Sequence, residues 1–398
     1  MKKAASFALG CKVNQYESEA IAELFAEKGY EIVGIDEEAD VYVINTCTVT
    51  NFGDKKSRHL VIGTKDRAQI VEMVEQYDRA NGVENHVSDI MKERVFEPLS
   101  IQKLANRTRA YLKIQDGCSQ YCSYCIIPYA RGPVRSLPLA EAVAQARQLQ
   151  AEGYRELVFT GIEISSWGRD LHDGSSLIDL VEAVAAAAPR LRLRLGSLEP
   201  RTVTEDFCRR ASQLPNLCPH FHLSLQSGCD KTLKEMNRKY DTEKYRQAVA
   251  TLRKYLPKVA LTTDIIVGFP GETEEDFRES YAFAEEIGFA KIHVFPYSPK
   301  RGTPAAARKD QLLNAVKSER SHTLIQLSDR MAADFLADAV GTDAEVLYER
   351  AVGDGIYEGH TTNYMKVHGR SEADLTNRIA KTHITRAEGE MLFGDVEV

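Results

Sequence analysis

Three cysteines lie close together in the first third of the sequence, at Cys118, Cys122 and Cys125. Their spacing is Cys-x3-Cys-x2-Cys, and they directly follow a predicted strand over residues 110–114. Three thiolates this close can hold a cubic 4Fe–4S cluster and leave one iron without a protein ligand. That open iron can chelate a small molecule through an amine and a carboxylate. The alternative is a zinc site with a distant fourth ligand, but zinc sites commonly use Cys-x2-Cys pairs, so the cluster is favoured.

Five further cysteines are spread over the chain. Cys11 and Cys47 each follow a predicted strand of the N-terminal region. Since parallel strands end at one edge of a sheet, we expect these two residues close together at that edge, separated by the width of a cluster. Cys208, Cys218 and Cys229 have no paired spacing, and we expect buried, inert thiols there.

The elements that would position these residues form three groups. Residues 1–100 predict a small, Rossmann-like α/β unit, with strands over 4–9, 30–35 and 41–45 and a helix over 16–28. Residues 108–300 alternate six strands with helices, which predicts parallel strands in an open, partial barrel. A helix over 310–340 is followed by short runs separated by glycines, which is typical of a small β-barrel.

Composition limits the class of protein. The 398 residues carry 51 Lys+Arg against 58 Asp+Glu, and 43% are apolar, which excludes a disordered chain. The longest apolar run, near residues 181–188, is far shorter than the about 20 residues of a membrane span. The first residues contain no long apolar segment of the secretory type. We therefore expect a cytoplasmic protein with reduced thiols, no membrane partner and a monomeric state.

The cysteine triad, with Tyr124 just before its last member, resembles the signature of radical S-adenosylmethionine enzymes. Four later segments, 161–163, 194–200, 222–228 and 263–272, resemble that family's cofactor-binding segments in the same order. Gly161-Ile162-Glu163 resembles its Gly-Gly-Glu segment, which holds the methionine amine, although Ile162 leaves only a backbone role at the middle position. The resemblance implies cofactor contacts from strand ends, at Tyr124, Gly161, Ile162, Glu163, Arg194, Ser197, Glu199, Gln226, Asp264 and Ile266.

The two ends of the chain resemble those of methylthiotransferases. The segments 10–15 and 45–49 are similar to the branch acting on N6-threonylcarbamoyladenosine, and the C-terminal region resembles a TRAM barrel. The resemblance implies domains over 1–100, 101–335 and 336–398. It also implies two 4Fe–4S clusters, one on Cys118, Cys122 and Cys125 and one involving Cys11 and Cys47. The implied partners are a tRNA anticodon stem-loop and an electron donor protein.

The implied reaction adds a methylthio group to C2 of N6-threonylcarbamoyladenosine at tRNA position 37. A radical formed from S-adenosylmethionine removes hydrogen from C2, and sulfur and a methyl group follow. Two alternatives use the same chemistry, on isopentenyladenosine in tRNA or on a ribosomal protein side chain. A third is a non-enzymatic RNA-binding protein with a structural cluster, which is disfavoured because a structural site needs four closed ligands.

The N-terminal region departs from the methylthiotransferase pattern. That family holds its second cluster on three cysteines, but no cysteine lies between Cys47 and Cys118. The path from the strand over 41–45 to the next one, near 60–63, barely allows one crossover of a dozen residues. We favour a missing segment between about Ser57 and Val61, and so a discontinuity there, over a true deletion. A true deletion would leave an enzyme that cleaves S-adenosylmethionine but cannot add sulfur.

The basic residues that could contact RNA are grouped in short stretches of the chain. They concentrate in residues 92–113 and 230–258, while residues 341–398 carry six Lys/Arg against eleven Asp/Glu. An RNA-binding barrel should present positive charge. We therefore expect the contacts of the C-terminal barrel to be confined to one loop, over residues 361–366.

Overall fold

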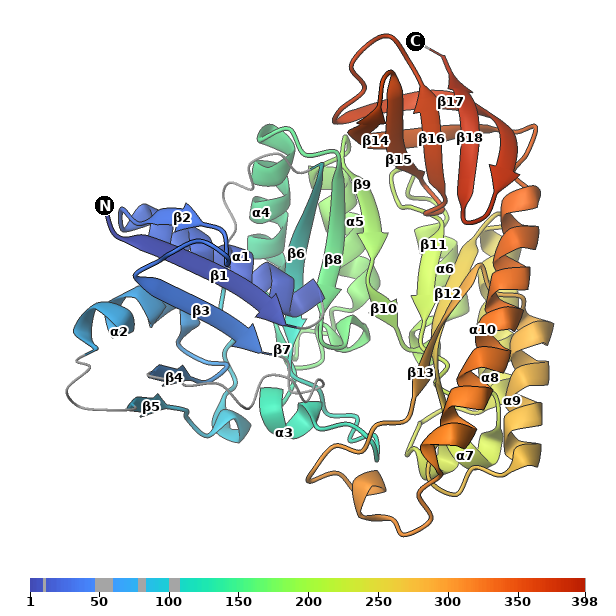
Figure 1. The fold of residues 1–398 in the computed structure, drawn as a ribbon, viewed down its shortest axis with the longest axis horizontal. Coiled ribbons are helices and arrows are strands. Elements are labelled where there is room, and N and C mark those ends of the chain that lie inside the picture. Colours follow the sequence, from blue (N-terminus) through green and yellow to red (C-terminus); the bar gives the residue numbers. More distant parts are fainter. Residues whose placement is uncertain (10–11, 47–59, 78–83, 100–107, 398) are drawn as a thin grey trace.

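The protein is described here from a computed structural model, which places residues 1–9, 12–46, 60–77, 84–99 and 108–397 (Figure 1). The expected positions of Cys11 and Cys47, and the expected discontinuity after Ser57, lie outside these described residues. Among the helices that are described, none combines the length and apolar character needed to cross a membrane.

A small three-stranded parallel sheet begins the chain, in the order β2-β1-β3. Its elements are β1 (Lys3–Leu9), α1 (Lys12–Glu27), β2 (Glu31–Val33) and β3 (Val41–Thr46). Helix α1 covers one face because Ile21 and Phe25, one turn apart, are buried against Ala4 of β1. Gly29, at φ +84°, lets the chain leave the helix and enter β2. A separate pair of parallel strands and a short helix follow: β4 (Leu60–Ile62), α2 (Ile70–Gln76) and β5 (Glu84–His86).

The central region consists of two four-stranded sheets that together form a partial barrel. The first has the order β7-β6-β8-β9 and the second β10-β11-β12-β13, and all neighbours are parallel except β6 and β7. A parallel bridge between Leu193 and Leu217 connects the two sheets. The strands are β6 (Arg109–Asp116), β7 (Arg135–Ser136), β8 (Glu156–Gly161), β9 (Arg192–Leu195), β10 (Ser197–Leu198), β11 (His220–Leu223), β12 (Ala260–Val267) and β13 (Lys291–Pro296).

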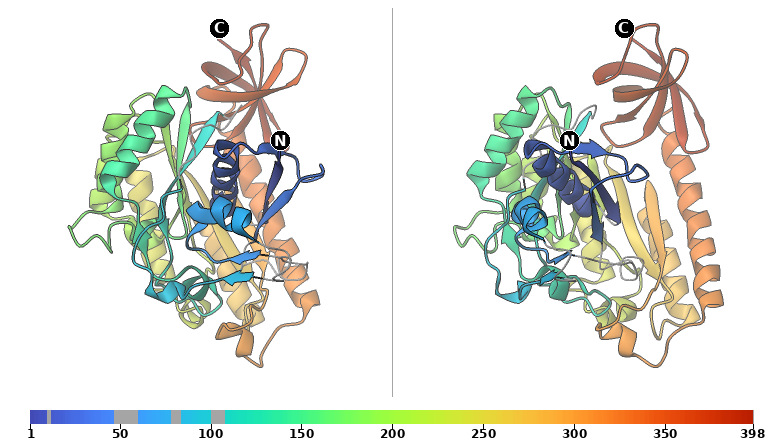
Figure 2. Two further views of the ribbon diagram at one scale, coloured as in Figure 1. Left: turned by 90° about the vertical axis from the view of Figure 1, so that its left-hand side faces the viewer. Right: turned by 60° about the vertical axis from the view of Figure 1, so that its left-hand side comes forward.

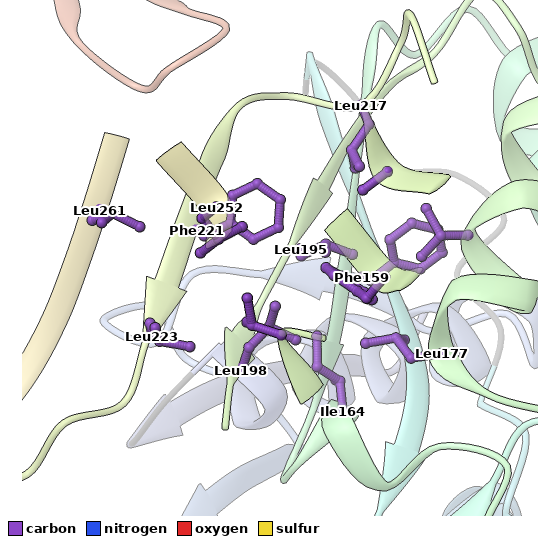
Figure 3. Close-up of a cluster of buried hydrophobic side chains, with 14 of the residues drawn as sticks. Phe159, Ile164, Leu177, Leu195, Leu198, Leu217, Phe221, Leu223, Leu252 and Leu261 are labelled. Carbon is purple, nitrogen blue, oxygen red and sulfur yellow. The ribbon is translucent and has the colours of Figure 1, made fainter. Parts of the chain in front are cut away.

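Helices lie outside these sheets, and the predicted βα alternation and partial barrel are confirmed (Figures 1 and 2). They are α3 (Ile127–Arg131), α4 (Leu139–Ala151), α5 (Leu177–Ala187), α6 (Glu205–Ala211), α7 (Asp230–Glu235), α8 (Thr242–Tyr255), α9 (Glu274–Ile287) and α10 (Asn314–Ala337). Figure 3 shows the core between strands and helices, where Phe159, Leu195 and Phe221 pack among other buried apolar side chains. Burying each such side chain stabilises the fold by about 1.5–3 kcal/mol, so the strands are anchored in a packed core.

The C-terminal region is a closed five-stranded barrel, as predicted, in the order β14-β15-β16-β18-β17. Its strands are β14 (Asp343–Gly353), β15 (Ile356–Thr361), β16 (Lys366–Arg370), β17 (Arg378–Glu388) and β18 (Met391–Val396). Val346, Val367 and Ile384 are fully buried at its centre. Closure pairs the edge strands with each other and removes the free edges that a small sheet would expose.

The C-terminal barrel lies at the end of the central strands where they begin. Arg109, the first residue of β6, forms an ion pair with Glu349, and its guanidinium lies over the Tyr364 ring at 5.1 Å. The chain leaves β6 at Asp116, at the other end of the strand, so eight residues separate the two ends by roughly 25 Å. Figure 1 accordingly shows the C-terminal barrel and α3 at opposite ends of the molecule.

Candidate functional site

The cysteine loop, residues 117–126, follows the C-terminal end of β6 and leads into α3. Gly117 starts it at φ +73°, and a Cβ there would lie 1.9 Å from the carbonyl oxygen of Pro133. The amide of Cys118 donates to the carbonyl of Gly132 at 3.0 Å. Only glycine therefore permits this close return of the chain, which fixes where Cys118 starts.

Neighbouring loops hold the middle of the cysteine loop. The amide of Ser123 donates to the Met236 carbonyl at 3.0 Å, and its hydroxyl donates to the Glu235 carbonyl at 2.8 Å. The Ala305 amide donates to the Ser123 carbonyl at 2.9 Å. Two later segments of the chain therefore hydrogen-bond to the backbone of Ser123 and hold the middle of the loop in place.

All six cysteines that the structure describes are free thiols, with Cys208, Cys218 and Cys229 buried as predicted. Burial raises the pKa of Cys118 to about 12 and that of Cys125 to about 11, and the neighbouring cysteine charges add to both shifts. A metal cluster must therefore displace protons from these thiols when it binds. Arg238 donates to the Cys122 sulfur at 3.2 Å.

The segment after β8 lies beside the cysteine loop, joined through a residue that the sequence did not single out. Gln115 is fully buried, and its amide nitrogen donates to the carbonyls of Asp116 and Gly117. Its amide oxygen accepts from the backbone amide of Glu163 at 2.7 Å. A Cβ on Gly161 would lie 2.9 Å from the Gln115 carbonyl, so a glycine is needed for this approach.

Glu163 presents a buried carboxylate next to Cys118. Neither of its oxygens has hydrogen-bonding geometry to any of the described residues, although Ser166 and Gln120 are near enough to lower its pKa in part. Burial, with the charge of Glu199, outweighs them and raises the pKa of Glu163 above its usual range. A buried carboxylate in this state fits a cationic group from a ligand, such as the ammonium of an amino acid.

Glu199 lies on the same side of the cysteine loop. It accepts from Arg201 at 2.6 Å and from Gln120 of the loop at 3.3 Å, while its amide donates to Ser165 at 2.9 Å. Ser197, two residues earlier on β10, is exposed. The structure thus brings Glu163 and Glu199 to the cysteine loop from two different strand ends.

The second sheet contributes the remaining predicted residues. The backbone of Gln226, at φ +69°, pairs with β12. Its amide donates to the Asp264 carbonyl, and its carbonyl accepts from the Ile266 amide. Ile266 packs on the same small apolar cluster as Tyr124. The Asp264 carboxylate lies 3.2 Å from Nε2 of His222, and His293 brings a third ligand atom within 4.8 Å of these. This polar group lies along β11, β12 and β13.

Arg194 lies elsewhere. Its guanidinium is buried, pairs with both oxygens of Glu156 at 2.9 Å, and donates to the Thr362 carbonyl of the C-terminal barrel at 3.0 Å. Burial raises the pKa of Glu156, but the hydrogen bonds from Arg194 and the nearby charges outweigh burial and lower it to about 2. The cofactor role expected for Arg194 stays a prediction, and these contacts instead join it to the C-terminal barrel.

Two basic residues of the stretch 92–113 are paired within the protein. Lys113 is 2% exposed and ion-paired with Glu17 and Asp116, and Arg109 is paired with Glu156 and Glu349. Neither side chain can reach a phosphate while these pairs persist. In the loop 361–366 the Tyr364 ring stacks on His360 and lies under Arg194 at 4.6 Å, and the expected RNA contact of this loop stays a prediction.

The fold and the cysteine loop agree with comparisons to known proteins. Residues 112–284 match the Radical SAM superfamily, and residues 3–75 match an uncharacterized protein family, UPF0004. A solved radical S-adenosylmethionine methyltransferase, TsrM from Kitasatospora setae, shares the fold with a TM-score of 0.54. It is 15% identical, and the match covers 77% of each chain. These findings define the class as a radical S-adenosylmethionine enzyme.

Relatives with curated names narrow the class. The threonylcarbamoyladenosine tRNA methylthiotransferase MtaB of Bacillus subtilis is 40% identical over 97% of this chain and 94% of its own length. Its counterpart in Thermotoga maritima is 32% identical over 98% and 95%. The tRNA-2-methylthio-N(6)-dimethylallyladenosine synthase of Moorella thermoacetica is 30% identical over 97% and 96%. The chain belongs to the tRNA methylthiotransferase family, whose cofactors are S-adenosylmethionine and 4Fe–4S clusters.

Proposed function

We propose that this enzyme adds a methylthio group to C2 of N6-threonylcarbamoyladenosine at position 37 of tRNA, next to the anticodon. The observation that carries the proposal is the cysteine loop with the buried Glu163 carboxylate beside it, in a chain whose MtaB relatives are named threonylcarbamoyladenosine tRNA methylthiotransferases. The dimethylallyladenosine synthases are 30% identical and supply the second candidate substrate, isopentenyladenosine.

Cys118, Cys122 and Cys125 would hold the cluster that binds S-adenosylmethionine. When bound, the cluster and S-adenosylmethionine supply the radical chemistry that the protein itself lacks. Glu163 would hold the cofactor ammonium, and Gln115 keeps the Glu163 backbone against the start of the cysteine loop. Gly161, Ile162, Ser197, Glu199, Gln226, Asp264 and Ile266 remain further proposed cofactor contacts, and Tyr124 packs beside Ile266.

Two exposed tyrosines, one in the cysteine loop and one in α3, form a surface on which an unpaired base can stack. Tyr121 and Tyr129 are 41% and 50% exposed, and their rings meet edge to face with centroids 5.7 Å apart. RNA loops are read mainly through splayed bases that stack on aromatic side chains. We infer that the anticodon loop contacts this pair while the modified adenosine enters the partial barrel.

The second cluster would involve Cys11 and Cys47. Leu9 and Thr46 are paired neighbours at the ends of β1 and β3, so the chain leaves both strands at one edge. A third ligand would come from a segment that this sequence lacks. The alignment with the Bacillus subtilis relative spans 426 positions, whereas 97% of 398 residues is about 386, which leaves about 40 positions without a counterpart.

The exposed face of the N-terminal sheet supports a missing segment. Phe7, Tyr42 and Ile44 are between 41% and 51% exposed, on strands whose other face is covered by α1. Strands of this kind are normally covered by helices on both faces. We therefore keep the proposal of a segment absent after Ser57 over that of a true deletion.

Four finer proposals accompany this function. The enzyme is cytoplasmic, acts as a monomer and receives electrons from a donor protein. The domains span residues 1–100, 101–335 and 336–398.

The function is tested with the anaerobically reconstituted product of the full-length natural gene and two tRNA substrates, one carrying N6-threonylcarbamoyladenosine and one carrying isopentenyladenosine. Nucleoside mass spectrometry should find the methylthio group on the first. Modification of the second alone would replace the proposal with the dimethylallyladenosine activity.

A further inference from the structure

A buried ionic cluster joins the N-terminal unit to the cysteine loop. Its centre is Glu17 of α1, which is 1% exposed and in contact with cations from three segments. Lys113 of β6 donates to its Oε1 at 2.8 Å, Arg131 of α3 donates to its Oε2 at 3.0 Å, and Arg67 pairs with the same carboxylate. Burial raises the pKa of Glu17, but these cations outweigh it and hold it well below its usual range.

The cluster continues directly into the cysteine loop at both of its ends. Lys113 also pairs with Asp116 at 2.6 Å, and Asp116 accepts from the Gly117 amide at 2.8 Å, one residue before Cys118. At the other end, Arg131 closes α3, and the next carbonyl, that of Gly132, accepts from the Cys118 amide. Glu17 therefore contacts residues on both sides of the predicted cluster ligands.

In the other direction the cluster reaches the segments that carry Cys11 and Cys47 in the sequence. Asn45, two residues before Cys47, donates to Glu17 at 3.4 Å and to the Asn14 carbonyl at 3.0 Å. Asn14, three residues after Cys11, donates back to the Asn45 side chain at 3.1 Å. This reciprocal pair ties the end of β3 to the first turn of α1.

We propose that Glu17 is a positioning residue that holds α1 and the end of β3, which adjoin Cys11 and Cys47 in the sequence, against the flanks of the Cys118–Cys125 loop. The chain of contacts runs from Asn45 and Asn14 through Glu17 to Asp116 and the loop. Sulfur transfer depends on the distance between the two cysteine sites, and small misplacements of reacting groups lower rates steeply. Loss of this connection should separate radical formation from methylthiolation. This consequence rests on the proposed function, whereas the structural connection does not.

The structural test uses the apoprotein and hydrogen–deuterium exchange. Glu17→Gln removes the charge and leaves three buried cations short of a partner, which strongly destabilises such clusters. Exchange should rise on the order of 10-fold or more in α1, and also in β6 and α3. Glu17→Asp should restore much of the protection. Glu27→Gln, on the exposed end of the same helix, is the matched control and should change nothing.

Faster exchange confined to α1 would overturn the proposal, because Glu17 would then stabilise only its own helix. If Glu17→Gln does not fold, Asn45→Ala breaks the same connection without burying an unpaired charge. It should loosen α1 and the end of β3 while the cysteine-loop flanks keep their protection.

The functional test counts 5′-deoxyadenosine formed per methylthiolated tRNA by the reconstituted enzyme. Glu17→Gln should raise this ratio by roughly 10-fold without changing S-adenosylmethionine affinity. An unchanged ratio would contradict the positioning role. If the wild-type product of the full-length natural gene yields no methylthiolated tRNA, the proposed function fails, and the exchange experiment still decides the connection.

Discussion

Replacing Glu163 with glutamine should weaken cofactor binding and stabilise the apoprotein at the same time. Both oxygens of this carboxylate are buried without a hydrogen bond among the described residues, beside Cys118. In the complex it would meet the ammonium of S-adenosylmethionine. A hydrogen bond to a charged group contributes about 1.5–3 kcal/mol. Loss of the charge should therefore raise the Kd by roughly 10–100-fold, as measured by anaerobic equilibrium dialysis of reconstituted protein.

The apoprotein should respond in the opposite sense. Because burial raises the pKa of Glu163, its charged form is penalised in the folded state at neutral pH. An amide costs less to bury than a carboxylate, so Glu163→Gln should raise the free energy of unfolding by about 1 kcal/mol at pH 7. Because the pKa of Glu163 is raised, its carboxylate destabilises the folded state only at pH values above the ordinary glutamate pKa. The difference between the two proteins should therefore disappear as the pH falls below about 4.3.

The matched control is Glu372→Gln, an exposed carboxylate on the C-terminal barrel, which should change neither quantity. A Kd within about twofold of wild type would show that Glu163 does not meet the cofactor ammonium. A Glu163→Gln apoprotein less stable than wild type would show that other groups of the protein stabilise the Glu163 carboxylate.

Three further predictions concern the cysteine loop. Cys122→Ala should abolish iron binding at this site and 5′-deoxyadenosine formation, since two thiolates cannot hold the cube; wild-type yields would refute the ligand assignment. Gly117→Ala should lower the free energy of unfolding by about 1–3 kcal/mol or more in denaturant titrations, because φ is +73° and the new Cβ meets the Pro133 carbonyl; an unchanged midpoint would contradict this. Tyr129→Ala should raise the KM for tRNA by roughly 5–100-fold, the worth of one stacked base, with S-adenosylmethionine cleavage in the absence of tRNA unaltered; an unchanged KM would exclude the stacking surface.

Much of the fold follows from local sequence patterns. The βα alternation predicted the partial barrel, because buried parallel strands and amphipathic helices leave clear periodic signals. The helix expected over 16–28 is present as α1, but it starts earlier, at Lys12, and the strand expected over 30–35 is only Glu31–Val33. The ends of helices and strands depend on capping residues and on tertiary neighbours, which the periodicity of apolar residues does not specify.

The site was predictable where its chemistry is local. The triad spacing located the cysteine loop, but nothing in the sequence marks Gln115 or Arg238, which act through contacts made by folding. One signal was available for Lys113, since a lysine in an otherwise apolar strand, between Leu112 and Ile114, calls for a buried partner. That partner, Glu17, lies 96 residues away. Arg194 shows the limit of a motif, because the motif places it at a strand end but does not specify that its side chain extends to the C-terminal barrel.

Iron content separates the two interpretations of the N-terminal region. Anaerobic reconstitution should give about eight irons per chain for two cubes and about four for one. The proposed missing segment predicts that the product of the full-length natural gene binds about eight, whereas a true deletion predicts about four.

Cells that lack this enzyme give the decisive measurement of its proposed function. Nucleosides from their tRNA are digested and analysed by mass spectrometry after complementation with the full-length natural gene or with its Cys122→Ala variant. The wild-type gene should restore the 2-methylthio derivative of N6-threonylcarbamoyladenosine, and the variant should leave the unthiolated nucleoside. Restoration by the variant, or methylthiolation of isopentenyladenosine instead, would contradict the proposed function.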